Sequence, residues 1–322
     1  MAAQLCYTEF IYAGRRWGAA LKYRRLFAAA LAALTLLSGC AKDSPQREGH
    51  PAGNYQRPPV AEAVFDGSDA VSDGGADIDL TNLGEGYVAV RAQHSARLKF
   101  QVIKGEETYN YDLANDGTPC FYPLQMGDGE YTFRVMRNTT GDRYAQLLST
   151  ARQVQLTSEF APFLRPSIQV NYTPRSACVA KAAQLSAEDT SQIGVVNSIY
   201  DYIVKNIRYD VEKAETVPKG YTPDPDETLK SGTGICYDYA ALAAAMLRSQ
   251  GIPTKLVTGY VAPNDLYHAW NLIYLEESGW IAVEFQVEAG NWVRIDTTFA
   301  AGGADLKDFV GDGKNYVDRY VY

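Results

Sequence analysis

Hydrophobic and polar residues alternate in the first half of the chain, most clearly in segments 98–102 (Leu-Lys-Phe-Gln-Val) and 131–135 (Tyr-Thr-Phe-Arg-Val). A period of two is typical of strands with one buried face. Asn-Asp-Gly and Gly-Asp-Gly turns at 115–117 and 127–129 punctuate these runs. We therefore expect about five short strands in about 80 residues, forming a small antiparallel β-sandwich over residues 77–157.

The period changes to that of a helix further along. Apolar side chains follow one another at steps of three and four, at Ile193, Val196, Tyr200, Ile203 and Ile207. This spacing predicts an amphipathic helix of about five turns. Upstream, Ser186 and Asp189 resemble a capping box, which predicts the start of that helix. The following segment 211–230 contains Thr-Pro-Asp-Pro-Asp-Glu at 222–227 and is predicted to be a loop with a rigid surface turn.

A second helix is predicted to begin near Cys236, directly after a Gly-Thr-Gly turn. Its larger side chains fall on one face and alanines fill the rest, a composition that favours helix. Gly251 and Pro253 then mark its end.

The chain becomes strand-like after Pro253, in segments 255–261, 269–275, 280–286 and 292–295. Two helices followed by a β-meander are typical of an α+β fold in which a helix packs on an antiparallel sheet. We assign this domain to residues 158–322. In the tail beyond Phe299 we expect packing residues, namely Leu306, Phe309, Tyr316 and Tyr320.

The N-terminal region has the pattern of a secretory signal, because basic residues precede an apolar run at 26–37 that is too short to span a bilayer. The ending Leu37-Ser-Gly-Cys40 resembles the lipobox of bacterial lipoproteins. This resemblance implies that residues 1–39 are removed and that Cys40 becomes a lipid anchor on the extracellular face of a bacterial cell membrane. The alternative is an ordinary signal peptide with an incidental cysteine.

Residues 40–76 are rich in Pro, Gly, Ser, Asp and Ala and show no apolar period. We expect a disordered tether there. Its aspartates lack the EF-hand spacing and the closing glutamate, which favours a solvated acidic segment over a calcium site.

Composition narrows the classes of partner. The chain has 322 residues, 46% of them hydrophobic, and a formal net charge of -8. This charge argues against binding nucleic acid. We expect a peptide or protein substrate, with contact to the membrane only through the anchor. The five cysteines show no CxxC spacing and no interleaved histidine, so we expect no metal and no cofactor. The sequence leaves open whether Cys120 and Cys178 form a disulfide.

Two residues suggest nucleophilic chemistry. A cysteine at the positive end of a helix is favoured as thiolate, although Cys236 could also be a small buried residue that fills a gap. His268, the only histidine after residue 94, stands where a polar loop meets an apolar segment. That position suits a catalytic base, which a thiol requires nearby.

The imidazole needs an acceptor on its second nitrogen. We assign that role to Asp296, at the end of the last predicted strand of the meander, with Glu284 as the alternative. Asp238 would lie on the helix of the nucleophile and Asp265 in a loop, which disfavours both. Asp296 could also be a simple turn residue.

Five segments together resemble the transglutaminase-like superfamily of papain-type cysteine enzymes. They are Gly234-Ile-Cys236-Tyr-Asp238-Tyr-Ala240, Leu247-Arg-Ser-Gln-Gly251-Ile-Pro253, Gly259-Tyr260, His268-Ala-Trp270 and Asp296-Thr-Thr-Phe299. The resemblance covers roughly residues 190 to 300. It implies a papain-like core with Cys236 as nucleophile, His268 as base and Asp296 as orienting acid. One departure is Thr297, where the family usually has proline.

The resemblance implies acyl transfer through a thioester, with peptide or amide hydrolysis, as in a cysteine protease, or protein cross-linking as the outcome. The Cys236 N–H would hold part of the oxyanion charge, and Tyr209 or Asn206 is the suggested second donor. A hypothesis of another class is a catalytically idle surface lipoprotein that binds wall or matrix components.

Overall fold

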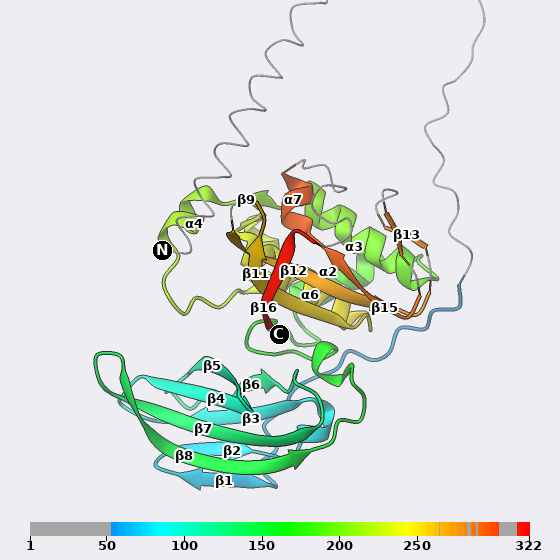
Figure 1. The fold of residues 1–322 in the computed structure, drawn as a ribbon. Coiled ribbons are helices and arrows are strands. Elements are labelled where there is room, and N and C mark those ends of the chain that lie inside the picture. Colours follow the sequence, from blue (N-terminus) through cyan, green and yellow to red (C-terminus); the bar gives the residue numbers. More distant parts are fainter. Residues whose placement is uncertain (1–52, 264, 278, 282–284, 288, 303–313) are drawn as a thin grey trace, which may run out of the picture.

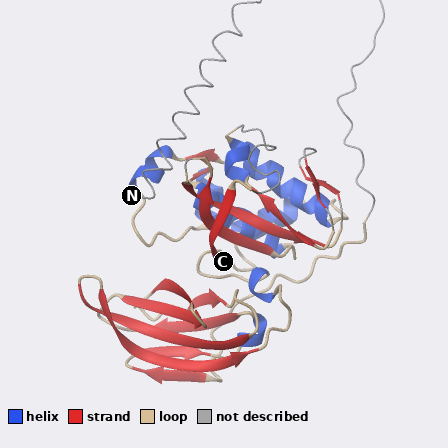
Figure 2. Cartoon of the chain, viewed as in Figure 1, coloured by secondary structure: helices blue, strands red, loops and turns tan. Residues whose placement is uncertain are grey.

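The computed structural model describes residues 53–263, 265–277, 279–281, 285–287, 289–302 and 314–322. The predicted signal segment, Cys40, Leu306 and Phe309 lie outside the described residues. Figure 1 shows two modules, a β-sandwich and a mixed module that contains α6 (Cys236–Ser249). In Figure 2 the first is built almost entirely of strands, whereas helices lie against the sheet of the second. The predicted α+β class with a preceding sandwich is confirmed.

The sandwich consists of two four-stranded antiparallel sheets. One contains β1 (Ala70–Asp73), β2 (Ala76–Asp79), β3 (Tyr87–Ala92) and β6 (Cys120–Pro123). The other contains β4 (Leu98–Lys104), β5 (Glu107–Leu113), β7 (Gly129–Thr140) and β8 (Arg143–Val154). The alternating residues of β4 and β7 face the shared core, where Phe100 and Phe133 are fully buried. The expected number of about five strands was wrong, because short or mostly exposed strands such as β1 carry no alternating pattern.

The predicted disordered tether over residues 40–76 is wrong for its described part. Residues 70–73 form β1, paired with β2. Further upstream, Tyr55 donates from its backbone to the Thr190 carbonyl at 2.9 Å, and its hydroxyl donates to the Gln250 carbonyl at 2.7 Å. Arg57 donates to the Asp189 carbonyl at 3.0 Å. A segment that is held by hydrogen bonds of its backbone and polar side chains does not need regularly spaced apolar residues. The absence of such spacing therefore wrongly suggested disorder.

The helices before Cys236 differ in part from the predicted ones. The amphipathic helix is α3 (Gln192–Asn206), and its N-cap is Ser191, whose hydroxyl accepts from the Gly194 N–H at 3.0 Å. The predicted capping box was therefore wrong, because Ser186 instead ends an unpredicted helix, α2 (Ala177–Leu185). Two 3-10 turns, η2 (Leu83–Glu85) and η3 (Ala161–Phe163), lie before α2.

The predicted loop 211–230 contains two short helices. These are α4 (Val211–Thr216), capped by the Asp210 side chain, and α5 (Pro225–Ser231), capped by Asp224. The Pro-Asp pattern that suggested a surface turn is in fact a helix start with proline at its first position. Two short strands, β9 (Arg208–Tyr209) and β10 (Thr233–Gly234), pair in parallel on either side of this region.

The sheet of the mixed module has the strand order β15-β12-β11-β16 and is antiparallel. Its strands are β11 (Thr254–Val261), β12 (Leu266–Leu275), β15 (Asn291–Ile295) and β16 (Tyr316–Val321). The predicted strand 280–286 is instead a separate hairpin of β13 (Gly279–Ile281) and β14 (Phe285–Val287). The tail, where only packing residues were expected, supplies β16. A short helix, α7 (Thr297–Ala301), follows β15.

The helix α6 (Cys236–Ser249) begins at Cys236, as predicted, and is buried on every side except at Tyr237. It contacts α2, α3 and α5 as well as β11 and β12. Its run of alanines lets these neighbours approach closely, since a helix enclosed on all sides needs small side chains where backbones come near. Gly251 ends it with a φ of 82°, a conformation that favours glycine. None of the helices in the described part of the chain is long and apolar enough to span a bilayer.

Near its C-terminal end, α6 carries a buried arginine. Arg248 donates hydrogen bonds to three carbonyl oxygens, those of Thr254 at 2.8 Å, Arg165 at 2.7 Å and Tyr322 at 3.0 Å. Burial lowers the pKa of this guanidinium to about 10, which leaves it charged at neutral pH. The Arg248 side chain therefore joins α6 to the start of β11, to Arg165 in the segment between the two modules, and to Tyr322 directly after β16.

We expect Arg248→Ala to lower the free energy of unfolding by about 3–5 kcal/mol, because three carbonyls lose their donor and a cavity remains. Urea denaturation followed by circular dichroism measures this loss. Arg143→Ala, at an exposed position, is the control and should change the value by less than about 0.5 kcal/mol. Equal effects of the two substitutions would contradict the structural role of Arg248.

Candidate active site

Cys236 is the first residue of α6 and follows an extended residue, Ile235. The turn before it is held by β9 and β10, and the Asp210 N–H donates to the Gly234 carbonyl at 2.9 Å. The first-turn amides of a helix lack acceptors inside the helix, and together with the macrodipole they favour an anion. Cys236 is 9% exposed, so this potential acts on a thiol largely shielded from water.

His268 is the third residue of β12, slightly further inside the strand than predicted. This strand packs on α6, and Asn271 donates to the carbonyl of Ala240, one helical turn after Cys236, at 3.0 Å. The imidazole is 2% exposed. It stacks on Phe299 of α7, with ring centroids 4.3 Å apart and an interplanar angle of 15°. Packing thus fixes the plane of the ring.

Asp296 lies between β15 and α7 and accepts four hydrogen bonds. Its Oδ1 accepts from the Thr298 N–H at 3.1 Å and the Phe299 N–H at 3.0 Å, which caps α7. Its Oδ2 lies 2.8 Å from His268 Nε2 and accepts from the Tyr316 hydroxyl at 3.0 Å. Because a carboxylate only accepts, Nε2 carries a proton, and in the neutral ring Nδ1 is the basic nitrogen.

The strand register explains how these residues meet. β12 pairs directly with β15, with Asn271 opposite Ile295, while the β13–β14 hairpin leaves the sheet between them. Asp296 therefore follows the strand next to that of His268. Helix α7 contacts α6, and Cys236 shares a buried cluster with Phe299 and Tyr316. The structure brings the three predicted residues to one region, and their catalytic roles stay predictions.

Tyr316 is the site residue that the sequence did not reveal as such. It was expected only to pack, but its hydroxyl donates to Asp296. Burial, together with the charge of Asp296, raises the pKa of Tyr316 well above its usual range, so it remains a donor. Its ring meets Trp270 edge-on at 4.9 Å, and the Arg294 guanidinium lies 4.5 Å from the ring centroid. Tyr316 lies 20 residues after Asp296 in the sequence, so no helix or strand periodicity could have predicted their contact.

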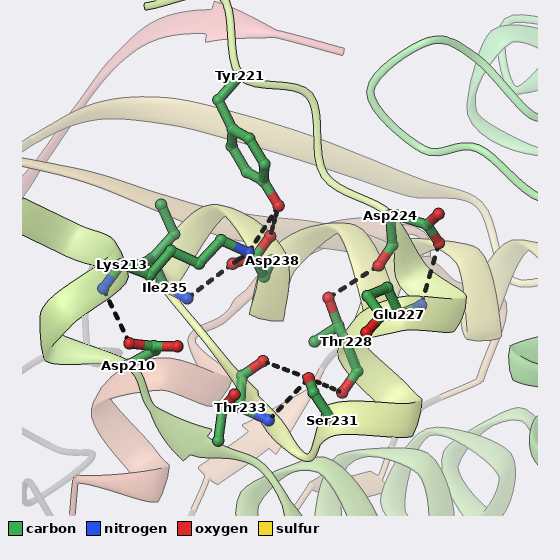
Figure 3. A network of polar contacts seen from close by, with 10 residues as sticks. All are labelled: Asp210, Lys213, Tyr221, Asp224, Glu227, Thr228, Ser231, Thr233, Ile235 and Asp238. Carbon is green, nitrogen blue, oxygen red and sulfur yellow. Dashed lines mark hydrogen bonds and ion pairs between the residues drawn. The ribbon is translucent and has the colours of Figure 1, made fainter. Parts of the chain in front are cut away.

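The alternative acids fall elsewhere. Glu284 lies outside the described residues, and Asp265 is exposed in the turn before β12. Asp238 is buried but binds Lys213 and Tyr221, as Figure 3 shows. These positions leave Asp296 as the carboxylate that contacts His268 among the described residues.

The two suggested oxyanion donors are placed differently. Asn206 donates to the Tyr202 carbonyl of its own helix at 2.8 Å. Tyr209, on β9, pairs with Gly234, two residues before Cys236. Proximity therefore favours Tyr209 over Asn206.

The other described cysteines differ from Cys236. Cys120 and Cys178 are free thiols, so they are not joined in a disulfide. Burial raises the pKa of the Cys178 thiol well above its usual range, which makes it unreactive. Among the described residues, no group of three or more His, Cys, Asp or Glu side chains could hold a metal ion.

Comparison with known proteins adds the following findings. Residues 179–296 match the model of the transglutaminase-like superfamily. The mouse kyphoscoliosis peptidase is 27% identical over 143 residues, 41% of this chain and 20% of that protein. Uncharacterized protein ML0607 of Mycobacterium leprae is 24% identical over 169 residues, 52% of this chain and 56% of that protein. The chain spans between 16% and 56% of the length of the curated relatives that it matches.

Among solved structures, a candidate cysteine protease of Cytophaga hutchinsonii is 16% identical, with a TM-score of 0.39, over 80% of this chain and 74% of that one. The superfamily match covers α3, α6, β11, β12 and β15, and it ends at Asp296. It therefore spans the elements that carry Cys236, His268 and Asp296. Residues 179–296 belong to the transglutaminase-like superfamily.

Proposed function

We propose that this chain is a cysteine enzyme that transfers acyl groups through a thioester on Cys236. The observation that carries the proposal is the 2.8 Å contact between His268 Nε2 and Asp296 in a buried site, next to the helix that begins with Cys236. This arrangement fixes the tautomer in which Nδ1 can accept the thiol proton.

The chemistry follows from these groups. Nδ1 of His268 takes the proton of Cys236, and the thiolate attacks a carboxamide or peptide carbonyl carbon. The carbonyl π electrons move to oxygen, where the Cys236 N–H and a second donor, for which we propose Tyr209, hold the charge. As the tetrahedral intermediate collapses, the protonated imidazole gives its proton to the leaving amine and a thioester remains. Water or a second amine, deprotonated by His268, then attacks the thioester carbon. The carbon–sulfur bond breaks, the acyl group leaves on the new nucleophile, and the imidazolium returns its proton to the Cys236 sulfur.

Hydrolysis is the outcome that we favour over cross-linking. The printed name of the mouse relative describes a peptidase, which supports hydrolysis for this chain by analogy only. A peptide or protein is the proposed substrate in either case. Both outcomes share the first half-reaction, so an experiment has to distinguish them at the second.

We further propose that Cys40 anchors the protein by a lipid to the extracellular face of a bacterial membrane. The Leu37-Ser-Gly-Cys40 ending supports this. Along the sequence, Cys40 lies 15 residues before Tyr55, which is hydrogen-bonded to the mixed module.

We expect Cys236→Ala to abolish turnover. The full chain is given a glutamine-containing protein and a fluorescent primary amine, and new peptide termini are read by mass spectrometry. Amine incorporation lost in the variant establishes cross-linking, and new termini lost in the variant establish hydrolysis. Cys120→Ala, which removes a thiol away from the site, is the matched control. Absence of both signals over a broad substrate set would favour the binding lipoprotein instead.

We expect Cys40→Ser to move the protein from the membrane fraction to the soluble fraction of expressing bacteria, because one acyl-bearing residue would be lost. Immunoblotting of the two fractions measures this, with Cys120→Ser as the control. An unchanged membrane fraction would refute the proposed anchor without affecting the proposed chemistry.

We expect Tyr316→Phe to lower kcat about tenfold with little change in KM, because Asp296 loses a hydrogen bond to a charged acceptor, worth about 1.5–3 kcal/mol. Steady-state kinetics in the assay above measures it. Tyr320→Phe, on the same strand, is the control. A Tyr316→Phe variant with wild-type kcat would show that this hydroxyl does not position the acid.

A further inference from the structure

A second buried carboxylate lies at the start of α6. Asp238 is 0% exposed. Its Oδ2 accepts from the Ile235 N–H at 2.8 Å and lies 2.7 Å from Lys213 Nζ. Its Oδ1 accepts from the Tyr221 hydroxyl at 2.5 Å. Figure 3 shows these side chains converging on Asp238 from different segments.

The partners come from the segment that the sequence suggested to be a loop. Helix α4 is docked beside the Cys236 turn, because the Asp210 N–H donates to the Gly234 carbonyl at 2.9 Å. Asp210 also caps α4 by accepting from the Lys213 N–H at 2.9 Å. The Lys213 ammonium in turn donates to the Tyr221 hydroxyl at 2.7 Å. Lys213 is thus held toward Asp238 from two directions.

The Asp238 carboxylate also shapes the turn that carries the nucleophile. The amide that it binds belongs to Ile235, the residue before Cys236. A Cβ placed on Gly234 would lie 2.7 Å from the Asp238 Cβ, so the turn and the side chain are in direct contact. Any movement of Asp238 would therefore move the peptide that precedes Cys236.

Asp238 brings a negative charge into the first turn of the helix, two residues after Cys236. A like charge nearby disfavours a thiolate, and a low-dielectric site strengthens the effect. Lys213 supplies the opposite charge. Tyr221 stays a neutral donor, since burial and then its hydrogen bond to Asp238 raise its pKa well above the usual range.

We propose that Lys213 is a positioning residue for the nucleophile Cys236. Lys213 acts through Asp238: it holds the carboxylate that fixes the turn before Cys236, and it cancels the negative charge of that carboxylate, which would otherwise oppose a thiolate on Cys236. This inference rests on the proposed function, with Cys236 as the nucleophile. It assigns a catalytic consequence to an ion pair outside the contact between His268 and Asp296.

Other titratable groups face this end of α6 from the elements around it. Besides Lys213 and Asp238 they are Tyr209 and Asp210 on and after β9, Tyr221 before α5, Tyr237 on α6, Tyr267 and His268 on β12, Asp296 before α7, Tyr322 after β16 and Tyr111 of β5. A single variant cannot separate Lys213 from these groups. A double-mutant cycle can, because the other groups stay the same at all four corners.

The experiment measures how fast iodoacetamide alkylates Cys236 as a function of pH, in the full chain, with the Cys236 peptide quantified by mass spectrometry. We expect Lys213→Met to raise the pH midpoint by about one unit, which slows alkylation about tenfold below the midpoint. Asp238→Asn should lower the midpoint, since Lys213 is then unopposed. The double variant should return to within about threefold of the wild-type rate, and Lys213→Arg should keep the wild-type midpoint.

Opposite signs in the two single variants, with recovery in the double, support the proposal, because general loosening of the fold would shift both in one direction. Equal signs, an unchanged Lys213→Met midpoint, or a double variant no faster than Lys213→Met would overturn it. If Lys213→Met does not fold by circular dichroism, Asp238→Asn decides, and a midpoint that is not lowered overturns the proposal.

Measurements on the wild-type protein alone test the proposed function, separately from the role of Lys213. It would show as an alkylation midpoint of an ordinary thiol, near 8.5, with no turnover that depends on Cys236. A low wild-type midpoint that ignores Lys213 would overturn only the inference about Lys213.

Discussion

Four donors converge on the Asp296 carboxylate, the ring of His268, two amides of α7 and the hydroxyl of Tyr316. The carboxylate is 1% exposed, so water cannot replace a donor that is lost, and an unmatched buried charge is costly. One charged group therefore holds β12, α7 and β16 in a single arrangement. The plane of the imidazole, its tautomer and the start of α7 all depend on it.

The burial of α6 determines where chemistry can occur. Because α6 is enclosed by helices on one side and by the sheet on the other, reagents can approach it only at an end. At its C-terminal end, Arg248 and the tight turn at Gly251 close the packing. The N-terminal end carries Cys236 and the half-buried Tyr237, and it is also the end whose amides favour an anion. Packing and electrostatics thus select the same residue.

Local signals in the sequence were sufficient for much of this site. Helix ends are set by nearby residues, so the start of α6 at Cys236 and its end at Gly251 could be predicted, and a meander brings His268 near Asp296 across 28 residues. Tyr316 and Lys213 could not be found in this way, because each meets its carboxylate partner across 20 or more residues with no periodic relation. The docked segment at Tyr55 was missed for a related reason, since backbone hydrogen bonds leave no trace in composition.

The two buried carboxylates explain why the site depends on distant segments. A thiolate adds a negative charge to a region that already contains Asp238 and Asp296. Asp238 is paired with the positive charge of Lys213, and Asp296 accepts a hydrogen bond from the His268 ring. The N-terminus of α6 favours the sulfur anion. In the proposed mechanism, the imidazolium that forms when His268 takes the Cys236 proton would face Asp296, so charge would be separated where opposite charge is already fixed. If Cys236 is the nucleophile that we propose, the segments that supply Lys213 and Tyr316 act on its electrostatics through Asp238 and Asp296, and neither needs to touch a substrate.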